Sequence, residues 1–461
     1  MSDKNTQNSS LAGDVKISMR EKIAYGLGDT SCNIVVGLTS SLLSFFYTDY
    51  IGVSIGMVGL IILISRFFDG VSDVIMGLIV DRTKSKYGKA RPWVLWASIP
   101  YAIGCVLLFT VPAGSDMVKA IYIFITYNFI QTVCYTALNL PYSSLAALMT
   151  RNQYERGSIN AIRMALSPFG RILATSVTLP LVKILGDDQR AWIIAAVIYA
   201  IIALGLLLFC FFNTKERVTV SNQQDSKLPI GQSLKALFKN KYWALGLLLW
   251  AMLSVYMTLS GTSLSYYSKW ILGDSLLTSP LYLAEQIPCI ALTFFIPLAL
   301  KKVSKRNLAL AGAIICMVGQ IGLVFYDGSF TLAIVSCICR GIGQAPLMGV
   351  VFSFIADSVE YGQYKTHLRL EGLIYSAASV GSKLGSGLMS AAFGWILSGA
   401  GYSGMSEVQS ASTLSTISAL FVWGPIVVWG VTAVILLFHK LEKQYPAIMK
   451  ELAEREARGE L

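Results

Sequence analysis

The chain has 461 residues, of which 54% are hydrophobic and 14% are charged, and its formal net charge is +11. Soluble domains carry about 25% charged residues, so this composition excludes a soluble enzyme and a disordered scaffold. At about 20 apolar residues per crossing, the length accommodates around twelve membrane-spanning helices. The positive charge is compatible with a nucleic-acid partner or with basic cytoplasmic loops of a membrane protein.

The sequence predicts no metal site, no organic cofactor and no disulfide framework. All eight cysteines lie inside apolar stretches, where they are typical of packing residues. The two histidines, His367 and His439, have no second ligand at a metal-binding spacing. The polar N-terminal segment has no apolar h-region, so we expect no cleaved signal peptide.

Twelve apolar blocks follow one another along the chain. They lie at about residues 23–49, 54–80, 93–112, 119–147, 158–184 and 191–213, and then at about 242–271, 279–300, 308–326, 330–357, 372–399 and 415–439. The pattern therefore predicts an all-α membrane protein with twelve transmembrane helices. Its predicted parts are a cytoplasmic N-terminal segment (1–22), an N-terminal six-helix bundle (23–213), a central cytoplasmic loop (214–241), a C-terminal six-helix bundle (242–440) and a cytoplasmic tail (441–461).

Basic residues are concentrated in the connections that follow even-numbered blocks. The loop after the second block, for example, contains Arg82, Lys84, Lys86, Lys89 and Arg91. Because Lys and Arg accumulate on cytoplasmic loops, both termini and the central loop are predicted to face the cytoplasm. Topology thus explains the net charge, and a nucleic-acid partner is not expected.

The second block contains three ionisable residues, Arg66, Asp69 and Asp73. Each such residue costs about 2.5 to 3.5 kcal/mol on insertion scales, so its presence indicates function. Spacings of three and four place all three on one helical face. The two carboxylates could accept a proton or coordinate a small cation. The competing interpretation is a structural ion pair, in which Arg66 neutralises Asp69.

Other polar residues within the blocks are candidates for binding a hydroxylated substrate such as a sugar. These residues are Asp29 and Asn33 in the first block, Thr136 and Asn139 in the fourth, Arg163 in the fifth and Lys383 in the eleventh, with Tyr142 and Tyr375 as aromatic faces for a pyranose. Most of the 22 tyrosines are expected to be packing or interface residues. The sequence gives Glu285, Arg171 and Arg340 no role.

Several segments together resemble the glycoside–pentoside–hexuronide:cation symporters, the melibiose permease group. The resemblance rests on residues 66–77 with the following loop 81–93, and on residues 25–29, 139–145 and 357–364. It extends from about Lys22 to the end of the twelfth block. It implies a major-facilitator-type fold, with two six-helix bundles around a midplane site and alternating access.

The resemblance also implies roles for individual residues. Asp69 and Asp73 match cation-site carboxylates of the family, and Arg163 and Lys383 match basic residues at its sugar site. The departures are Asn139 and Asn33 at positions of aspartates, and Ser143 and Met348 at positions of tryptophans. We assign Asp69, Asp73, Asn139 and Thr136 to cation coupling and Asp29, Asn33, Asn139, Ser143, Arg163, Lys383, Tyr142 and Tyr375 to sugar binding.

The loop after the second block and the cytoplasmic end of the tenth are predicted to act in gating. The gating candidates are Arg66, Asp81, Arg82, Lys89, Arg91, Asp357 and Glu360. Two carboxylates without a third suit a proton better than sodium, so proton coupling is favoured and sodium coupling is the alternative.

The substrate is left open among glycosides, pentosides and hexuronides. The predicted protein is a multi-pass symporter of the bacterial cytoplasmic membrane, working as a monomer in the lipid bilayer. A transporter-like sugar sensor is a second possibility.

Overall fold

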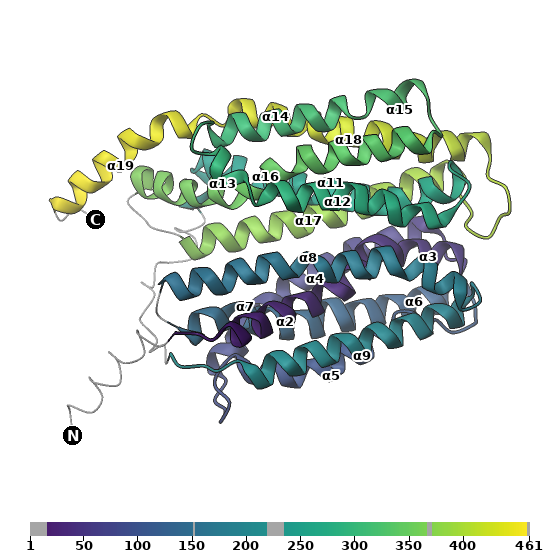
Figure 1. Ribbon diagram of the computed structural model, residues 1–461, viewed down its shortest axis with the longest axis horizontal. Coiled ribbons are helices and arrows are strands. Elements are labelled where there is room, and N and C mark those ends of the chain that lie inside the picture. The colour runs from purple at the N-terminus through teal and green to yellow at the C-terminus, as the bar shows by residue number, and fades with distance from the viewer. Residues whose placement is uncertain (1–15, 151–152, 219–234, 367–370, 459–461) are drawn as a thin grey trace. The chain divides into compact units, whose positions relative to one another are not determined.

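The computed structural model describes residues 16–150, 153–218, 235–366 and 371–458. All regular structure in these ranges is helical, as predicted. The chain divides into two compact units (Figure 1), one made of residues 1–223 with 403–405 and the other of residues 224–402 with 406–461.

The first unit contains the first six predicted crossings. Its helices are α2 (Met19–Gly37), η1 (Leu38–Leu42), α3 (Leu43–Asp49), α4 (Ile55–Arg82), α5 (Arg91–Leu107), α6 (Asp116–Asn128), η2 (Phe129–Tyr135), α7 (Thr136–Met149), α8 (Gln153–Ile184) and α9 (Gln189–Asn213). Two of them, η1 and η2, are π-helical turns that interrupt the first and fourth crossings. Such turns hold one residue more than an α-helical turn.

Local signals explain where several of these helices begin. The side chain of Ser18 accepts the N–H of Glu21 at the start of α2, and Ser54 and Asp188 cap α4 and α9 in the same way.

Helices α2 and α8 pack closely because α8 has Gly170 at the contact. A β-carbon there would lie 2.1 Å from the carbonyl oxygen of Thr30.

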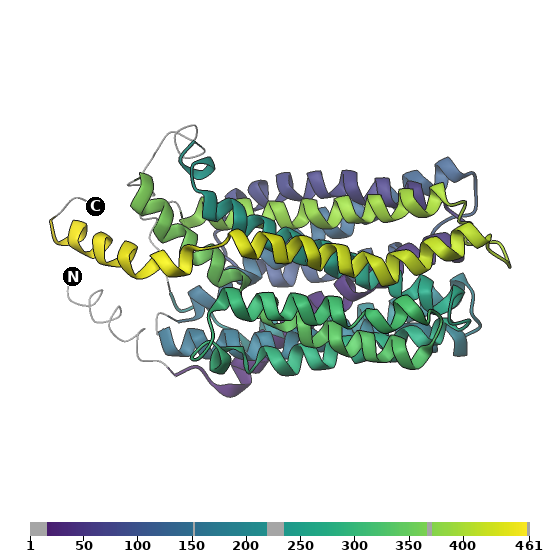
Figure 2. The same ribbon diagram turned by 90° about the horizontal axis from the view of Figure 1, so that it is seen from above.

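The second unit contains the last six predicted crossings and a C-terminal helix. Its helices are α11 (Lys241–Trp270), η3 (Ser275–Leu277), α12 (Thr278–Thr293), α13 (Ile296–Ala299), α14 (Lys305–Val318), α15 (Ile321–Phe325), α16 (Phe330–Thr366), α17 (Glu371–Gly399), α18 (Ala411–Phe438) and α19 (Leu441–Ala457). Figure 2 shows α19 continuing from the end of α18. Its apolar residues Leu441, Ile448 and Leu452 form a buried cluster with Tyr242 and Tyr361.

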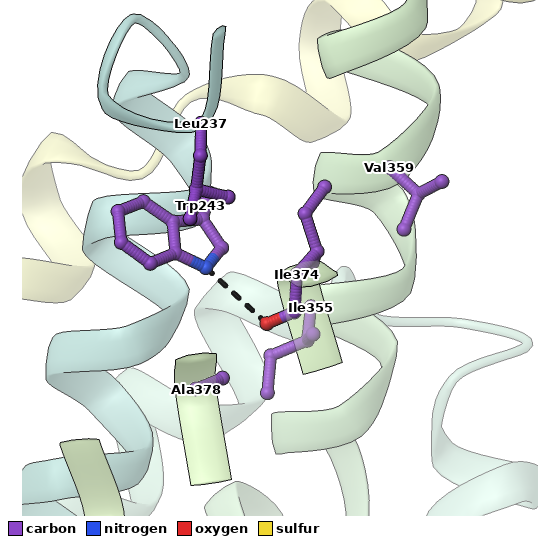
Figure 3. Close-up of a cluster of buried hydrophobic side chains, with 6 residues drawn as sticks. All are labelled: Leu237, Trp243, Ile355, Val359, Ile374 and Ala378. Atoms are coloured by element: carbon purple, nitrogen blue, oxygen red, sulfur yellow. Dashed lines mark hydrogen bonds between the residues drawn. The ribbon is translucent and has the colours of Figure 1, made fainter. Parts of the chain in front are cut away.

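A second buried cluster joins the ends of α11, α16 and α17 (Figure 3). Trp243 packs among Leu237, Ile355, Val359, Ile374 and Ala378, and its Nε1 donates to the carbonyl oxygen of Ile374 at 3.3 Å. The indole therefore fills an apolar gap while its only polar group has a partner, as a buried tryptophan requires.

The helices suit membrane spans. By length and composition, the described part of the chain contains nine long helical segments that could cross a membrane. Of the other three predicted crossings, α5 and α12 are shorter, with 17 and 16 residues, and α17 is rich in glycine and serine. Many large apolar side chains, including Ile201 on α9 and Val427 on α18, are exposed, as expected for contact with lipid tails.

Candidate functional site

Asp69 lies buried on α4, and both of its carboxylate oxygens have a donor. Arg66 Nη1 donates to Oδ2 at 3.1 Å, and the Thr132 hydroxyl donates to Oδ1 at 2.5 Å. Thr132 belongs to the π-helical turn η2, so the fourth crossing reaches the carboxylate through this turn.

Asp73 lies one turn further along α4 and is half-buried. It accepts a hydrogen bond from the Thr136 hydroxyl at 3.1 Å, and the Ser72 hydroxyl donates to Thr136 Oγ1 at 3.2 Å. Two threonines at a spacing of four thus contact two aspartates at the same spacing. Asn139 is half-buried on α7, one turn beyond Thr136.

The coupling cluster is defined as Arg66, Asp69, Asp73, Thr132 and Thr136. Its two carboxylates lie one helical turn apart on α4, and Arg66 pairs with Asp69 at 3.1 Å. Two carboxylates this close in a low-dielectric region favour uptake of a proton or a small cation. No group of three or more His, Cys, Asp or Glu side chains arranged to hold a metal ion occurs among the described residues.

A second polar cluster joins α2 to α8. Arg163 Nη2 contacts Asp29 Oδ1 at 3.2 Å. Asn33 Nδ2 donates to the carbonyl oxygen of Asp29 at 2.9 Å and to Ser167 Oγ at 2.8 Å. The structure therefore brings together three residues that the sequence assigned to sugar binding, and the Arg163 charge is neutralised within this cluster.

Tyr142 on α7 is fully buried beside these residues. Its ring stacks on Tyr25 with centroids 4.6 Å apart, and the Arg163 guanidinium lies over the ring at 5.1 Å. Each of the two tyrosine hydroxyls donates to the carbonyl oxygen of the other residue. In this conformation the ring packs against protein, and its role in stacking on a sugar stays a prediction.

The remaining sugar-site candidates lie in different places. Ser143 is exposed on α7, and Lys383 is half-buried on α17 of the second unit. The side chains of Tyr375 and of the gating candidate Asp81 lie outside what the structure describes. The roles of all four stay predictions.

The predicted gating loop is organised by an acidic residue that the sequence did not single out. Glu216 accepts backbone N–H groups at the start of α5: Oε2 accepts from Lys89 at 2.8 Å, and Oε1 accepts from Ala90 at 2.8 Å and from Arg91 at 2.6 Å. Arg91 Nη2 donates to the carbonyl oxygen of Phe211 at 2.8 Å. The carboxylate satisfies donors that a helix start leaves unpaired. Arg82 is exposed.

The residues around Glu216 tie further elements of the first unit together. Arg217 forms two bonds to Glu21 at the start of α2, at 2.7 and 3.0 Å. The backbone N–H groups of Arg217 and Val218 donate to the carbonyl oxygen of Leu148 at 2.8 and 2.9 Å. The segment after α9 therefore connects the ends of α2, α5 and α7.

The second unit has a corresponding arrangement. Lys305 at the start of α14 forms an ion pair with Asp357 on α16 and donates to Ser353 Oγ at 2.9 Å. Glu442 Oε1 accepts the backbone N–H of Lys305 at 3.1 Å, and Arg306 Nε donates to the carbonyl oxygen of Leu436 at 2.9 Å. Glu360, the other acidic gating candidate, lies half-buried one turn after Asp357.

A buried carboxylate in the second unit also has specific donors. Glu285 on α12 accepts the Tyr256 hydroxyl at 2.7 Å and the Ser260 hydroxyl at 2.7 Å, both from α11. Arg340 on α16 is fully buried and donates to Gln320 Oε1 at 2.9 Å. Both residues were noticed in the sequence, but their partners lie in other segments of the chain.

Comparison with known proteins agrees with this architecture. Residues 24–443 match the family described as MFS/sugar transport protein. The chain is 34% identical to the isoprimeverose transporter of Lactiplantibacillus pentosus over 460 residues, covering 98% of this chain and 95% of that protein. It is 32% identical to the putative glycoside/cation symporter YagG of Escherichia coli (strain K12), covering 96% of this chain and 97% of that protein.

Solved structures support the fold alone, because their sequences are distant. A structure from a study of proton-dependent oligopeptide transporters aligns with a TM-score of 0.66 and 13% identity, covering 94% of this chain and all of that one. The nucleoside transporter NupG aligns with a TM-score of 0.60 and 15% identity, covering 91% of this chain and 99% of that one.

These findings define a multi-pass membrane transporter of the major facilitator type, and not an enzyme. The chain belongs to the MFS/sugar transport protein family, within its glycoside–pentoside–hexuronide:cation symporters.

Proposed function

We propose that this protein is a proton-coupled symporter that brings a neutral glycoside into the bacterial cell by alternating access. The observation that carries the coupling is the pair of carboxylates Asp69 and Asp73 on α4, each of which accepts a hydrogen bond from a threonine hydroxyl of the fourth crossing. The family assignment and the relatives named as glycoside/cation symporters support symport of a sugar.

The state of Arg163 favours a neutral substrate over a hexuronide. An anionic sugar needs a cationic partner in the cavity, and the Arg163 guanidinium is already paired with Asp29 at 3.2 Å. The similarity to an isoprimeverose transporter over nearly the whole chain is in line with a neutral glycoside. Asn33 and the Asp29–Arg163 pair can bond sugar hydroxyls as donors and acceptors without requiring charge on the sugar.

The coupling mechanism follows from the cost of buried charge. In the outward-open state a proton binds one carboxylate of the coupling cluster and neutralises it. The glycoside then binds, and the cavity closes at lower cost because one ionised carboxylate fewer is enclosed. A carrier loaded with only the sugar would enclose that ionised carboxylate, and a carrier loaded with only the proton would enclose polar groups of the empty sugar site; both states are unfavourable. Release of proton and sugar inside resets the carrier.

Sodium coupling is the second candidate. Hydroxyls of Ser72, Thr132 and Thr136 lie beside the two aspartates and are oxygen ligands of the kind that Na⁺ accepts. We favour the proton because a sodium ion is bound best by several oxygen ligands that carry negative charge, and one of the two carboxylates is already paired with Arg66.

Uptake into proteoliposomes distinguishes these possibilities. Labelled xylosyl and glucosyl disaccharides, a galactoside and a glucuronide are tested, with the pH gradient and the sodium gradient imposed separately. We expect accumulation of a neutral disaccharide driven by an inward proton gradient, unchanged by sodium and abolished by a protonophore. Accumulation that is stimulated by sodium would mean that sodium, and not a proton, is the coupling ion. Accumulation of the glucuronide alone would overturn the proposal of a neutral substrate. Saturable binding without uptake of any sugar would point to a sensor.

A further inference from the structure

Asn128, the last residue of α6, extends the hydrogen bonds of the coupling cluster to a further helix. Its Nδ2 donates to the backbone carbonyl oxygen of Phe124 and to Ser65 Oγ on α4, each at 2.8 Å. The Ser65 hydroxyl uses its own hydrogen on the carbonyl oxygen of Ile61 at 2.8 Å. A carbonyl oxygen can only accept, so the contact with Phe124 sets the orientation of the Asn128 amide. The amide oxygen Oδ1 therefore faces Thr132 Oγ1, 3.1 Å away.

Thr132 has one hydroxyl hydrogen for two acceptors. Its Oγ1 lies 2.5 Å from Asp69 Oδ1 and 3.1 Å from Asn128 Oδ1. With Asp69 ionised, the hydrogen lies toward Asp69, and the Asn128 oxygen faces a lone pair of Thr132. With a proton on Asp69 Oδ1, Asp69 donates to Thr132 and Thr132 donates to Asn128, so both contacts contain a hydrogen. Buried polar groups favour the arrangement in which each acceptor has a donor.

We propose that Asp69 is the carboxylate that takes up the coupling proton, and that Asn128 is a positioning residue that favours this state through Thr132. The inference rests on the proton coupling proposed above. A proton from solution adds to Asp69 Oδ1, and the Thr132 hydroxyl rotates about its C–O bond so that its hydrogen turns from Asp69 to Asn128. No bond within Thr132 breaks.

The ion pair with Arg66 is compatible with a neutral Asp69. Arg66 contacts the other oxygen, Oδ2, at 3.1 Å, and this oxygen of a protonated carboxyl group is still a hydrogen-bond acceptor. The Arg66 side chain is 23% exposed and that of Asp69 is 4% exposed. The guanidinium is thus the less buried of the two groups, and its charge is not left in a fully buried site when the carboxylate is neutralised.

Other side chains that face this region come from α4 and from the elements packed on it. They are Arg66 and Asp73 on α4, Tyr127 on α6, Tyr135 in η2, the neutral Thr136 on α7, and Tyr47 on α3, which interacts with Tyr127. Tyrosine ionises at about pH 10 and arginine above about pH 12, so within this set Asp73 shares the pH range of Asp69. An experiment therefore has to distinguish the two aspartates.

Infrared difference spectroscopy of the purified full chain detects a protonated carboxyl group directly and does not depend on transport. The C=O band of protonated carboxyl groups is followed as a function of pH. We expect a titrating band that disappears in Asp69→Asn and persists in Asp73→Asn. A band that disappears in Asp73→Asn instead, or in neither variant, would overturn the assignment of the proton to Asp69.

Asn128→Leu removes the acceptor and keeps a side chain of similar size. The midpoint of the band's titration is expected to move by about 0.4 to 1 pH unit toward lower pH, because the protonated state loses one neutral hydrogen bond. The pH dependence of sugar uptake is expected to move in the same direction. Asn128→Ala also lacks the acceptor, and it replaces the leucine variant if that variant does not fold.

Asn160→Leu is the matched control. The Nδ2 atom of Asn160 also donates to a carbonyl oxygen four residues earlier, that of Arg156 at 3.0 Å, but Asn160 is exposed on α8. Its substitution is expected to leave the midpoint unchanged. An equal shift in Asn160→Leu and Asn128→Leu would overturn the role of Asn128.

Double variants test whether Asn128 acts through Thr132. Thr132→Val removes the hydroxyl, and Thr132→Ser keeps it. Asn128→Leu is expected to cause no further shift in the valine background and the full shift in the serine background. Equal shifts in both backgrounds, or no shift in Asn128→Leu alone, would overturn this inference and leave the proton-coupled function standing. Uptake by the wild type that is driven by sodium and not by a proton gradient would overturn the proposed function itself.

Discussion

Glu216 and Glu442 hold equivalent positions in the two halves of the chain. Glu216 accepts the backbone N–H groups of residues 89–91, where α5 begins, and Glu442 accepts the backbone N–H of Lys305, the first residue of α14. In each half an arginine beside the accepting backbone, Arg91 or Arg306, donates to a carbonyl oxygen near the end of the last crossing of that half. The internal repeat expected of this fold is thus preserved in specific polar contacts.

Glu216→Gln is expected to lower the stability of the protein by about 1 to 2 kcal/mol, because hydrogen bonds to a charged acceptor are replaced by weaker neutral ones. The loss is read from the thermal unfolding of the purified protein. Glu442→Gln is expected to act in the same direction and less strongly, since Glu442 makes fewer short bonds to backbone groups.

Glu454→Gln is the matched control for both variants. Glu454 is exposed on α19, so its substitution is expected to change stability by less than about 0.5 kcal/mol. If Glu216→Gln unfolded at the same temperature as this control, the carboxylate would not hold the start of α5.

Asp69→Asn is expected to abolish accumulation of the sugar against its gradient. The substitution removes the charge that a proton neutralises, and it leaves the Thr132 hydroxyl an acceptor to bond. Exchange of internal for external sugar at equal concentrations is expected to continue, because closure of the cavity no longer needs the proton. Asp116→Asn, at the exposed start of α6, serves as the control. Full accumulation by Asp69→Asn would exclude this carboxylate from coupling.

The ion pair between Arg163 and Asp29 is expected to behave as a unit. Arg163→Gln leaves the Asp29 carboxylate without its cationic partner and is expected to cost roughly 3 kcal/mol, as is usual when one member of a buried pair is removed. Adding Asp29→Asn to the same chain is expected to restore much of that loss. The double-variant cycle is measured by thermal unfolding, and additive losses would mean that the two charges are not coupled.

Gly170→Ala is expected to destabilise the contact between α2 and α8, because the new β-carbon would lie 2.1 Å from the Thr30 carbonyl oxygen. The yield of monodisperse protein after detergent extraction and the melting temperature report the effect. Gly157→Ala in the same helix meets no atom within 4 Å and is expected to be neutral or stabilising, by up to about 1 kcal/mol. Equal behaviour of the two variants would exclude the close approach.

The fold could be predicted from the sequence because its signals are local. Apolar blocks of spanning length and basic loops define crossings without any knowledge of contacts, as α9 and α18 illustrate. The pairing of Arg66 with Asp69 could also be predicted, since both residues lie on one face of one helix.

Contacts between distant residues could not be predicted in this way. Thr132 is 63 residues from Asp69 in the chain, and the sequence did not predict their contact. The one local signal was the spacing of four between Thr132 and Thr136, which places both threonines on the same helical face. Glu216 lies in a charged loop, where the sequence offered no reason to separate it from its neighbours. Its role depends on the backbone of residues 89–91, which no side-chain pattern reveals.

The π-helical turns η1 and η2 make the first and fourth crossings tolerant of a change in chain length. In a regular α-helix, removing one residue rotates everything that follows by about 100°. A π-helical turn contains a surplus residue, so removing one residue there lets the turn become α-helical and keeps the helix beyond it in register. In the fourth crossing, such a deletion within residues 129–135 would leave Thr136 and Asn139 facing α4 and would act mainly on Thr132, which the turn itself holds against Asp69.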